Sequence, residues 1–183
     1  MKLKLLTTSL FAVALYTGAA VADHGPTTVG GASMLPERNI IENAVNSGDH
    51  KTLVAAVQAA ELVDVLQGEG PFTVFAPTDE AFAALPEGTV DTLLKPENKA
   101  QLQTVLTYHV VPGNMNRDAL WEEIMENDGT VAFKTVQGEY LTVARNGNNL
   151  MVMDAQGNSA NITVVDVAQS NGVIHVIDSV LMP

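Results

Sequence analysis

The chain has 183 residues, of which 46% are apolar and 16% are charged, a composition typical of a globular protein rather than a disordered or fibrous one. Its 9 Lys and Arg residues against 21 Asp and Glu residues give a net charge of −12, which argues against recognition of phosphate backbones and so against a nucleic-acid partner. The sequence contains no cysteine, which excludes disulfides, thiolate zinc sites and thiol nucleophiles.

Residues 1–22 are predicted to be an export signal rather than part of the fold. Lys2 and Lys4 form a basic start, residues 5–16 are mostly apolar, and Ala20-Val21-Ala22 fits the small-x-small cleavage pattern. The apolar run is shorter than the roughly 20 residues that a membrane span needs. We therefore expect an exported product, periplasmic or extracellular, with no membrane span after cleavage of the signal.

The following segment, residues 23–38, is rich in Gly, Thr and Pro and has no hydrophobic period, so we interpret it as an exposed leader. A single domain is expected from residue 39 to residue 183. Asn39 can cap a first short helix. A second helix is indicated by apolar residues at helical spacing from Leu53 to Leu66.

The middle of the chain alternates a buried strand with capped helices. Residues 72–76 are apolar on both faces, as in a buried strand, and Thr78 can cap the helix that follows. Pro96 is expected to open the longest helix, which carries His109 on its apolar face. Asn116 can cap one more helix.

From Val131 onward the hydrophobic period changes to two, and turn signals such as Asn146-Gly147 separate the alternating runs. Helices therefore come first and a β-rich half second. This order predicts an α+β fold and disfavours an alternating, doubly wound nucleotide-binding fold.

Three stretches together resemble the motifs of the fasciclin-like domain family: residues 70–82 (GPFTVFAPTDEAF), residues 106–113 (LTYHVVPG) and residues 171–183 (NGVIHVIDSVLMP). They occur in the family's order, and the resemblance spans about residues 39–183. The motif positions that we expect to be structural are Thr73, Phe75, Pro77, Thr78, Asp79, Phe82, Asp166, Asn171, Gly172, His175 and Asp178.

The resemblance implies an α+β fold in which N-terminal helices pack on a wedge of two small β-sheets. It also implies a secreted, non-enzymatic role in adhesion or binding, with no cofactor. The partner would be an unidentified surface protein or glycan. A single copy of the module offers one site unless the chain associates, and we expect a monomer or a weak oligomer.

The Tyr108-His109 pair is a candidate binding site, because the resemblance implies that this region contacts receptors in some animal members. The alternative is that His109, on an apolar helix face, is buried and satisfied by a backbone or carboxylate partner. Tyr108 lies one residue round the helix and is expected to be partly exposed. Trp121, near Met125 on the next helix, is a second candidate for surface contact.

His175 is interpreted as a structural pin rather than a pH-sensitive or catalytic group, because Val173 and Ile177 flank it on one strand face. If Asn171-Gly172 is a two-residue turn, His175 lies opposite Ala168 and diagonal to Asp166.

Catalytic and metal-site signatures are absent from the sequence: it has no Gly-x-Ser-x-Gly elbow, no phosphate-binding glycine loop and no HxxxH spacing. The first functional hypothesis is therefore a secreted adhesion or binding module. The alternative is a periplasmic small-ligand-binding or stress protein with a pocket between helices and sheet.

Overall fold

A computed structural model of the chain describes residues 26–183. The predicted signal peptide lies outside these residues. The helical segments are α1 (Ile40–Ala44), α2 (Lys51–Ala59), α3 (Val63–Leu66), α4 (Asp79–Ala83), α5 (Thr89–Leu93), the 3-10 turn η1 (Pro96–Asn98), α6 (Lys99–Tyr108) and α7 (Arg117–Glu126). The strands are β1 (Thr27–Val29), β2 (Ala32–Met34), β3 (Phe72–Pro77), β4 (Val110–Pro112), β5 (Thr130–Lys134), β6 (Tyr140–Asn146), β7 (Asn149–Met153), β8 (Ser159–Gln169) and β9 (Gly172–Ile177).

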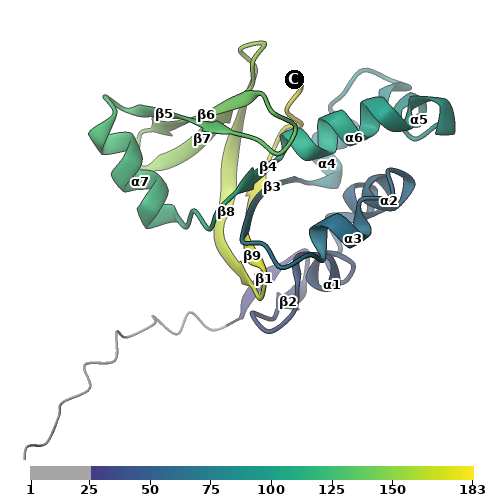
Figure 1. Cartoon of the computed structure of the whole chain (residues 1–183), viewed down its shortest axis with the longest axis horizontal. Coiled ribbons are helices and arrows are strands. Elements are labelled where there is room, and N and C mark those ends of the chain that lie inside the picture. Colours follow the sequence, from purple (N-terminus) through teal and green to yellow (C-terminus); the bar gives the residue numbers. More distant parts are fainter. Residues whose placement is uncertain (1–25) are drawn as a thin grey trace, which may run out of the picture.

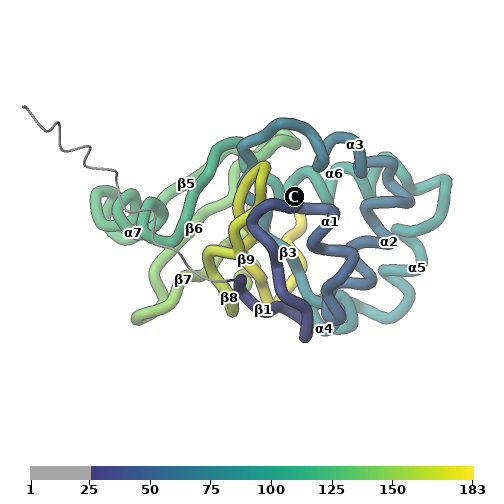
Figure 2. The backbone as a smooth tube through the Cα atoms, turned by 90° about the horizontal axis from the view of Figure 1, so that it is seen from below, coloured from purple at the N-terminus to yellow at the C-terminus, as the bar shows by residue number. Residues whose placement is uncertain are grey.

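The central sheet has seven strands in the order β4-β3-β9-β8-β7-β6-β5. Only β3 and β9 pair in parallel, and this pairing brings the first and third sequence motifs side by side. Helices α1 to α6 lie on one side of β3 and β9, whereas β5, β6, β7 and α7 lie on the other (Figures 1 and 2). The fold is therefore α+β, as predicted.

The long strand β8 joins the two sheets of the expected wedge into one. It pairs with β7 near its start and with β9 over the rest, and its register to β9 shifts between Ile162 and Val164 and again between Val164 and Val167. Bulges of this kind bend a strand and increase its twist. The sheet consequently folds at β8 into a helix-covered part and a part that packs against α7.

The side chains of asparagine and threonine fix where three helices begin. Asn39 accepts a hydrogen bond from the Glu42 N–H at 2.9 Å while Glu42 returns one to the Asn39 N–H, forming a capping box. Thr78 and Asn116 cap α4 and α7 by accepting the Ala81 and Ala119 N–H groups, as the sequence predicts.

The predicted exposed leader is corrected by the structure over the residues that the structure describes. Residues 27–34 form the β1–β2 hairpin, and Val29 and Met34 are buried in the core next to α1. The hairpin is too short to show a clear period in sequence, and its apolar residues become buried only because α1 and β8 lie beside it. The folded unit therefore begins at least twelve residues before the expected boundary at residue 39.

Two large groups of buried side chains form the interior. The helical core lies between the helices and β3, β9 and β8; it includes Val57, Leu66, Leu106, Val167 and Ile174. The sheet core lies between α7 and strands β5–β8; it includes Tyr108, Leu120, Ile124, Leu141 and Val143. Within residues 26–183 no helix is both long and apolar enough to span a bilayer.

Candidate functional site

Tyr108 is fully buried rather than partly exposed, which corrects the sequence prediction. Its hydroxyl donates to the Tyr140 carbonyl at 2.8 Å and accepts from the Ala155 N–H at 3.0 Å. Burial raises the pKa of this phenol above its usual value, because the charged form would lose hydration. Tyr108 thus links α6 to β6 and to the turn after β7, and offers no surface for a partner.

His109 is also buried, and both of its ring nitrogens are bonded to the main chain. Nδ1 lies 2.8 Å from the Val105 carbonyl and can only donate to it, so Nε2 must accept the Leu181 N–H at 3.0 Å. This arrangement requires a neutral ring, and burial lowers its pKa from 6.5 to about 4. The Tyr108-His109 motif is therefore part of the core and not a receptor contact.

His175 also bonds main-chain groups through both ring nitrogens, but it has the opposite tautomer. Its Nε2 lies 2.8 Å from the Met115 carbonyl and its Nδ1 lies 3.4 Å from the Asp166 N–H, so Nε2 carries the proton. Burial lowers the pKa of His175 below the ordinary value. The ring also stacks on Phe75 with the centroids 5.7 Å apart.

The register predicted for the β8–β9 hairpin is wrong, because the two-residue turn begins one residue earlier than expected. Gln169 pairs with Gly172 and Ala168 with Val173, so the turn residues are Ser170 and Asn171, not Asn171 and Gly172. The Asn171 side chain explains the shift, because it bonds other elements, as described next.

Asn171 ties the start of α1 and the end of α3 to the hairpin. Its side-chain oxygen accepts the Ile40 N–H at 3.0 Å, and its side-chain nitrogen donates to the carbonyls of Leu66 and Gly68. The neighbouring Gly172 lies so close to β3 that a Cβ built there would be 2.0 Å from the Phe72 carbonyl oxygen, which explains why glycine is required.

Asp166 contacts the N-terminus of α7 rather than His175. Its carboxylate accepts the Arg117 N–H at 2.6 Å, and its backbone has φ of 57°, within the bulged part of β8. Asp166 and His175 are neighbours, as expected, but the contact between them is made by the Asp166 main-chain N–H and not by its carboxylate. A carboxylate at this helix end also complements the helix dipole.

Other motif residues form similar local bonds. Asp79 accepts the N–H groups of Thr52 and Lys51 at the start of α2; burial alone would raise its pKa, but these hydrogen bonds outweigh burial and lower it. Thr73 donates to the Gly113 carbonyl at 2.8 Å and accepts the Met115 N–H. Three further positions complete the set: Asp178 bonds the Asn161 backbone and side chain, and Pro77 and Phe82 are buried.

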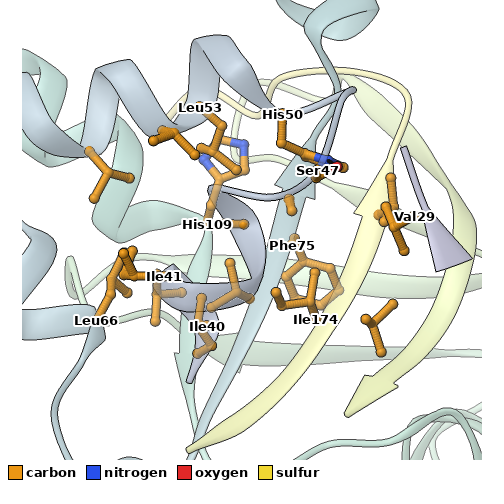
Figure 3. A pocket seen from close by; sticks show the side chains of 18 of the residues that line it. Val29, Ile40, Ile41, Ser47, His50, Leu53, Leu66, Phe75, His109 and Ile174 are labelled. Atoms are coloured by element: carbon orange, nitrogen blue, oxygen red, sulfur yellow. Dashed lines mark hydrogen bonds between the residues drawn. The ribbon is translucent and has the colours of Figure 1, made fainter. Parts of the chain in front are cut away.

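A cavity lies in the helical core, between α1, α2 and α6 on one side and β3, β9 and β8 on the other (Figure 3). The volume open to the centres of water-sized atoms is about 50 Å³. Seventeen of the twenty lining residues are apolar and none carries a formal charge; the three polar ones are Ser47, His50 and His109. The cavity matches the alternative hypothesis of a pocket between helices and sheet in its location, though Tyr108 does not line it.

His50 is the one buried side chain of the described residues with a polar atom that has no hydrogen-bond partner. Its Nδ1 lies 2.8 Å from Ser47 Oγ, whereas Nε2 is unpaired. Burial lowers the pKa of His50, and the nearby Ala76 carbonyl and two carboxylates offset this only in part. The sequence gives no signal for a role of His50. The residue follows Ser47-Gly48-Asp49, a stretch that only predicts the end of the first helix.

A surface cluster of a different kind surrounds Trp121 on α7, and we call it the Trp121 patch: Trp121, Arg117, Met125 and Arg145. The guanidinium carbons of Arg117 and Arg145 lie 5.2 and 5.4 Å from the indole ring centre. Arg145 Nη1 lies 3.4 Å from Met125 Sδ, and Met125 is 58% exposed. Trp121 itself is half-buried against the sheet core.

Among residues 26–183 no three His, Asp or Glu side chains come close enough together to hold a metal ion. The three buried histidines of this part of the chain are separate: His109 and His175 bond main-chain groups, and His50 bonds Ser47.

Comparison with known proteins matches residues 48–183 to the Fasciclin domain. The protein sll1483 of Synechocystis sp. is 49% identical over 144 residues, which cover 79% of this chain and 73% of that protein. The immunogenic protein MPB70 of Mycobacterium bovis is 38% identical over 170 residues, or 90% of this chain and 78% of its own length.

Among solved structures, the fold is similar to that of a FAS1 domain pair from the insect cell adhesion molecule Fasciclin I, with a TM-score of 0.71. The match covers 80% of this chain and 51% of that one, at 17% sequence identity. At this level of identity the similarity concerns the fold.

Proposed function

Because the chain belongs to the fasciclin domain family, whose members include cell adhesion proteins, we propose that it is an exported, non-enzymatic module that binds a protein or glycan on a cell surface. The Trp121 patch is the observation that supports this role best. It replaces the buried Tyr108-His109 pair as the contact region.

The patch has the composition of a binding hot spot. Trp, Arg and Met are enriched at protein interfaces, and Trp and Arg dominate the residues whose truncation costs most affinity. The patch also concentrates two of the seven cationic side chains in residues 26–183 of a strongly acidic chain. Because α7 also carries four acidic residues, these two guanidinium groups are localised hydrogen-bond donors in an acidic surface, and such donors favour one orientation of approach.

Arg145 is the member that is available to a partner. Within residues 26–183 its guanidinium forms no ion pair, and its contacts are with Trp121 and Met125. Arg117, in contrast, lies 3.7 Å from the Asp118 carboxylate. A planar guanidinium held against an indole ring can donate two parallel hydrogen bonds to one carboxylate. The partner surface is therefore expected to carry carboxylates, from acidic side chains or uronic-acid sugars.

The test is capture of the native cell envelope by the purified mature chain, at several salt concentrations. The variant Arg145→Glu reverses the charge of the patch and should weaken capture by at least about tenfold, as expected for a hot-spot residue. The matched control is Lys95→Glu, which makes the same charge change at an exposed site before α6. Equal capture by Arg145→Glu and wild type, or equal loss by both variants, would refute the patch as the contact.

A further inference from the structure

The helical-core cavity shares no lining residue with the Trp121 patch, so the proposed surface contact does not involve it. Its sheet side is formed by side chains such as Phe75 and Ile174, and its helical side by Ile41 and Leu53 (Figure 3). The sheet core, by comparison, is filled by side chains that are almost entirely inaccessible. The empty space is therefore local to the region where the helices meet the sheet.

The cavity opens between α1 and α2. Four of its lining residues on these helices are partly exposed, namely Ile41, Ala44, Leu53 and Val54. The lining residues on β3 and β9, such as Val74 and Val176, are buried. An apolar molecule could therefore enter from the helical side and reach the sheet without unfolding any strand.

The lining sets the chemistry of what can bind. A charged group inside would have no counter-ion, since none of the lining residues carries a formal charge, and burial of an unpaired ion is strongly unfavourable. His109 is fully bonded to main-chain groups, so it offers nothing to a ligand. His50 Nε2 is unpaired, but it has almost no accessible surface and the Ala76 carbonyl lies near its ring, so it offers nothing to an occupant either.

The occupant that fits this lining is therefore a hydrocarbon chain. Any polar group of the molecule would remain in water at the opening between α1 and α2, because inside the cavity it would have no partner.

We propose that this cavity binds the aliphatic end of an uncharged molecule, whose polar group remains in water at the opening between α1 and α2. The enclosed space holds roughly four water-sized groups, given that one water needs about 10–15 Å³ of such volume. The ligand is thus either a free short-chain alcohol or the end of a hydrocarbon chain of a larger lipid whose remainder passes out between α1 and α2.

The probe is a series of 1-alkanols from butanol to dodecanol, titrated into the mature chain and followed by methyl NMR of the cavity lining. Saturable shifts at Ile41, Leu53 and Ile174 are expected. Affinity that peaks near hexanol indicates a free small molecule, whereas affinity that keeps rising with chain length indicates a lipid end. No saturable shift with any alkanol would refute the proposal.

A filling variant tests the location. In Ala44→Phe the new ring occupies the opening, so hexanol binding should weaken at least about tenfold, the equivalent of 1.4 kcal/mol. The matched control is Ala55→Phe, the same substitution on the exposed face of α2, outside the cavity lining. Thermal melting of both variants verifies folding. Hexanol binding that is unchanged in Ala44→Phe would place the ligand elsewhere and overturn the proposal.

The chemistry of the lining is tested by comparing hexanol with 1,6-hexanediol, which has the same chain with a hydroxyl at both ends. Whichever end enters, the diol buries a hydroxyl without a partner, so it should bind at least about tenfold more weakly than hexanol. Equal affinity for the two would show that no chain end enters the apolar cavity and would overturn the proposal. Arg145→Glu should bind hexanol as wild type does, so failure of the surface proposal and failure of the cavity proposal are separable.

Discussion

The sheet core and the helical core of this protein are built from similar side chains but packed differently. In the sheet core Leu120, Ile124 and Val143 have no solvent exposure, and Tyr108 satisfies its hydroxyl with two main-chain partners. The helical core has an apolar cavity and one unpaired buried nitrogen, on His50. Interiors normally pack like organic crystals, so the looser region is the one that has capacity for a ligand.

The motifs that resemble the family and the proposed binding positions are different sets of residues. The Tyr-His motif and the residues around Asn171 make main-chain hydrogen bonds that join distant segments, so they hold the two cores in fixed relation. The candidate binding positions lie outside these motifs, at the Trp121 patch and at the cavity. In this chain the motifs that identify the family are structural, and binding is proposed at positions that they do not include.

The largest expected effect is a matched pair of leucine truncations. Leu120→Ala in the sheet core should destabilise the fold by about 4 kcal/mol, whereas Leu66→Ala, which lines the cavity, should cost about 2 kcal/mol, because fewer contacts are lost beside existing space. Urea unfolding of both variants measures the difference. Equal costs would mean that the cavity is closed in solution and that the two cores are equally packed.

A pair of histidine truncations compares a bonded ring with a partly bonded one. His175→Ala removes two main-chain bonds and the stacking on Phe75, and should cost about 3 kcal/mol. His50→Ala removes one bond to Ser47 and an unpaired nitrogen, and should cost about 1 kcal/mol. Thermal melting tests this prediction. A melting temperature of His175→Ala equal to that of wild type would contradict the structural role of this ring.

A third prediction concerns the dependence of stability on pH. Burial lowers the pKa of His109 from 6.5 to about 4, so the unfolded chain binds a proton between these values and the folded chain does not. Stability should therefore fall by about 1.4 kcal/mol per pH unit as pH decreases from 6.5 towards 4, with no contribution above 6.5. The lowered pKa values of His50 and His175 act in the same direction.

Urea unfolding at pH 7, 6 and 5 measures this slope, and NMR of the ring nitrogens identifies the tautomers. His109 should remain neutral at pH 5 with its proton on Nδ1, and at pH 7 the neutral ring of His175 should carry its proton on Nε2. A His109 ring that titrates near 6.5 would show that its hydrogen bonds to Val105 and Leu181 are not maintained in solution.

Local patterns predicted much of the fold because they depend on neighbours in sequence. The caps at Asn39, Thr78 and Asn116 follow from side chains that bond N–H groups a few residues ahead, and the buried strand 72–76 from its continuous apolar run. The turn of the last hairpin was placed one residue late, because Asn171 is held by Ile40, Leu66 and Gly68, which are distant in sequence.

The amino-acid sequence by itself determined the α+β class, the helix starts and the family, since each rests on short-range periodicity, capping or contiguous motifs. The tertiary structure alone decided which side chains are hidden. Tyr108 is buried because β6 and the turn after β7 close over it, and the β1–β2 hairpin joins the core because α1 lies beside it. The cavity and its unpaired His50 arise where separate elements fail to fill the space between them, a property of packing that no local pattern encodes.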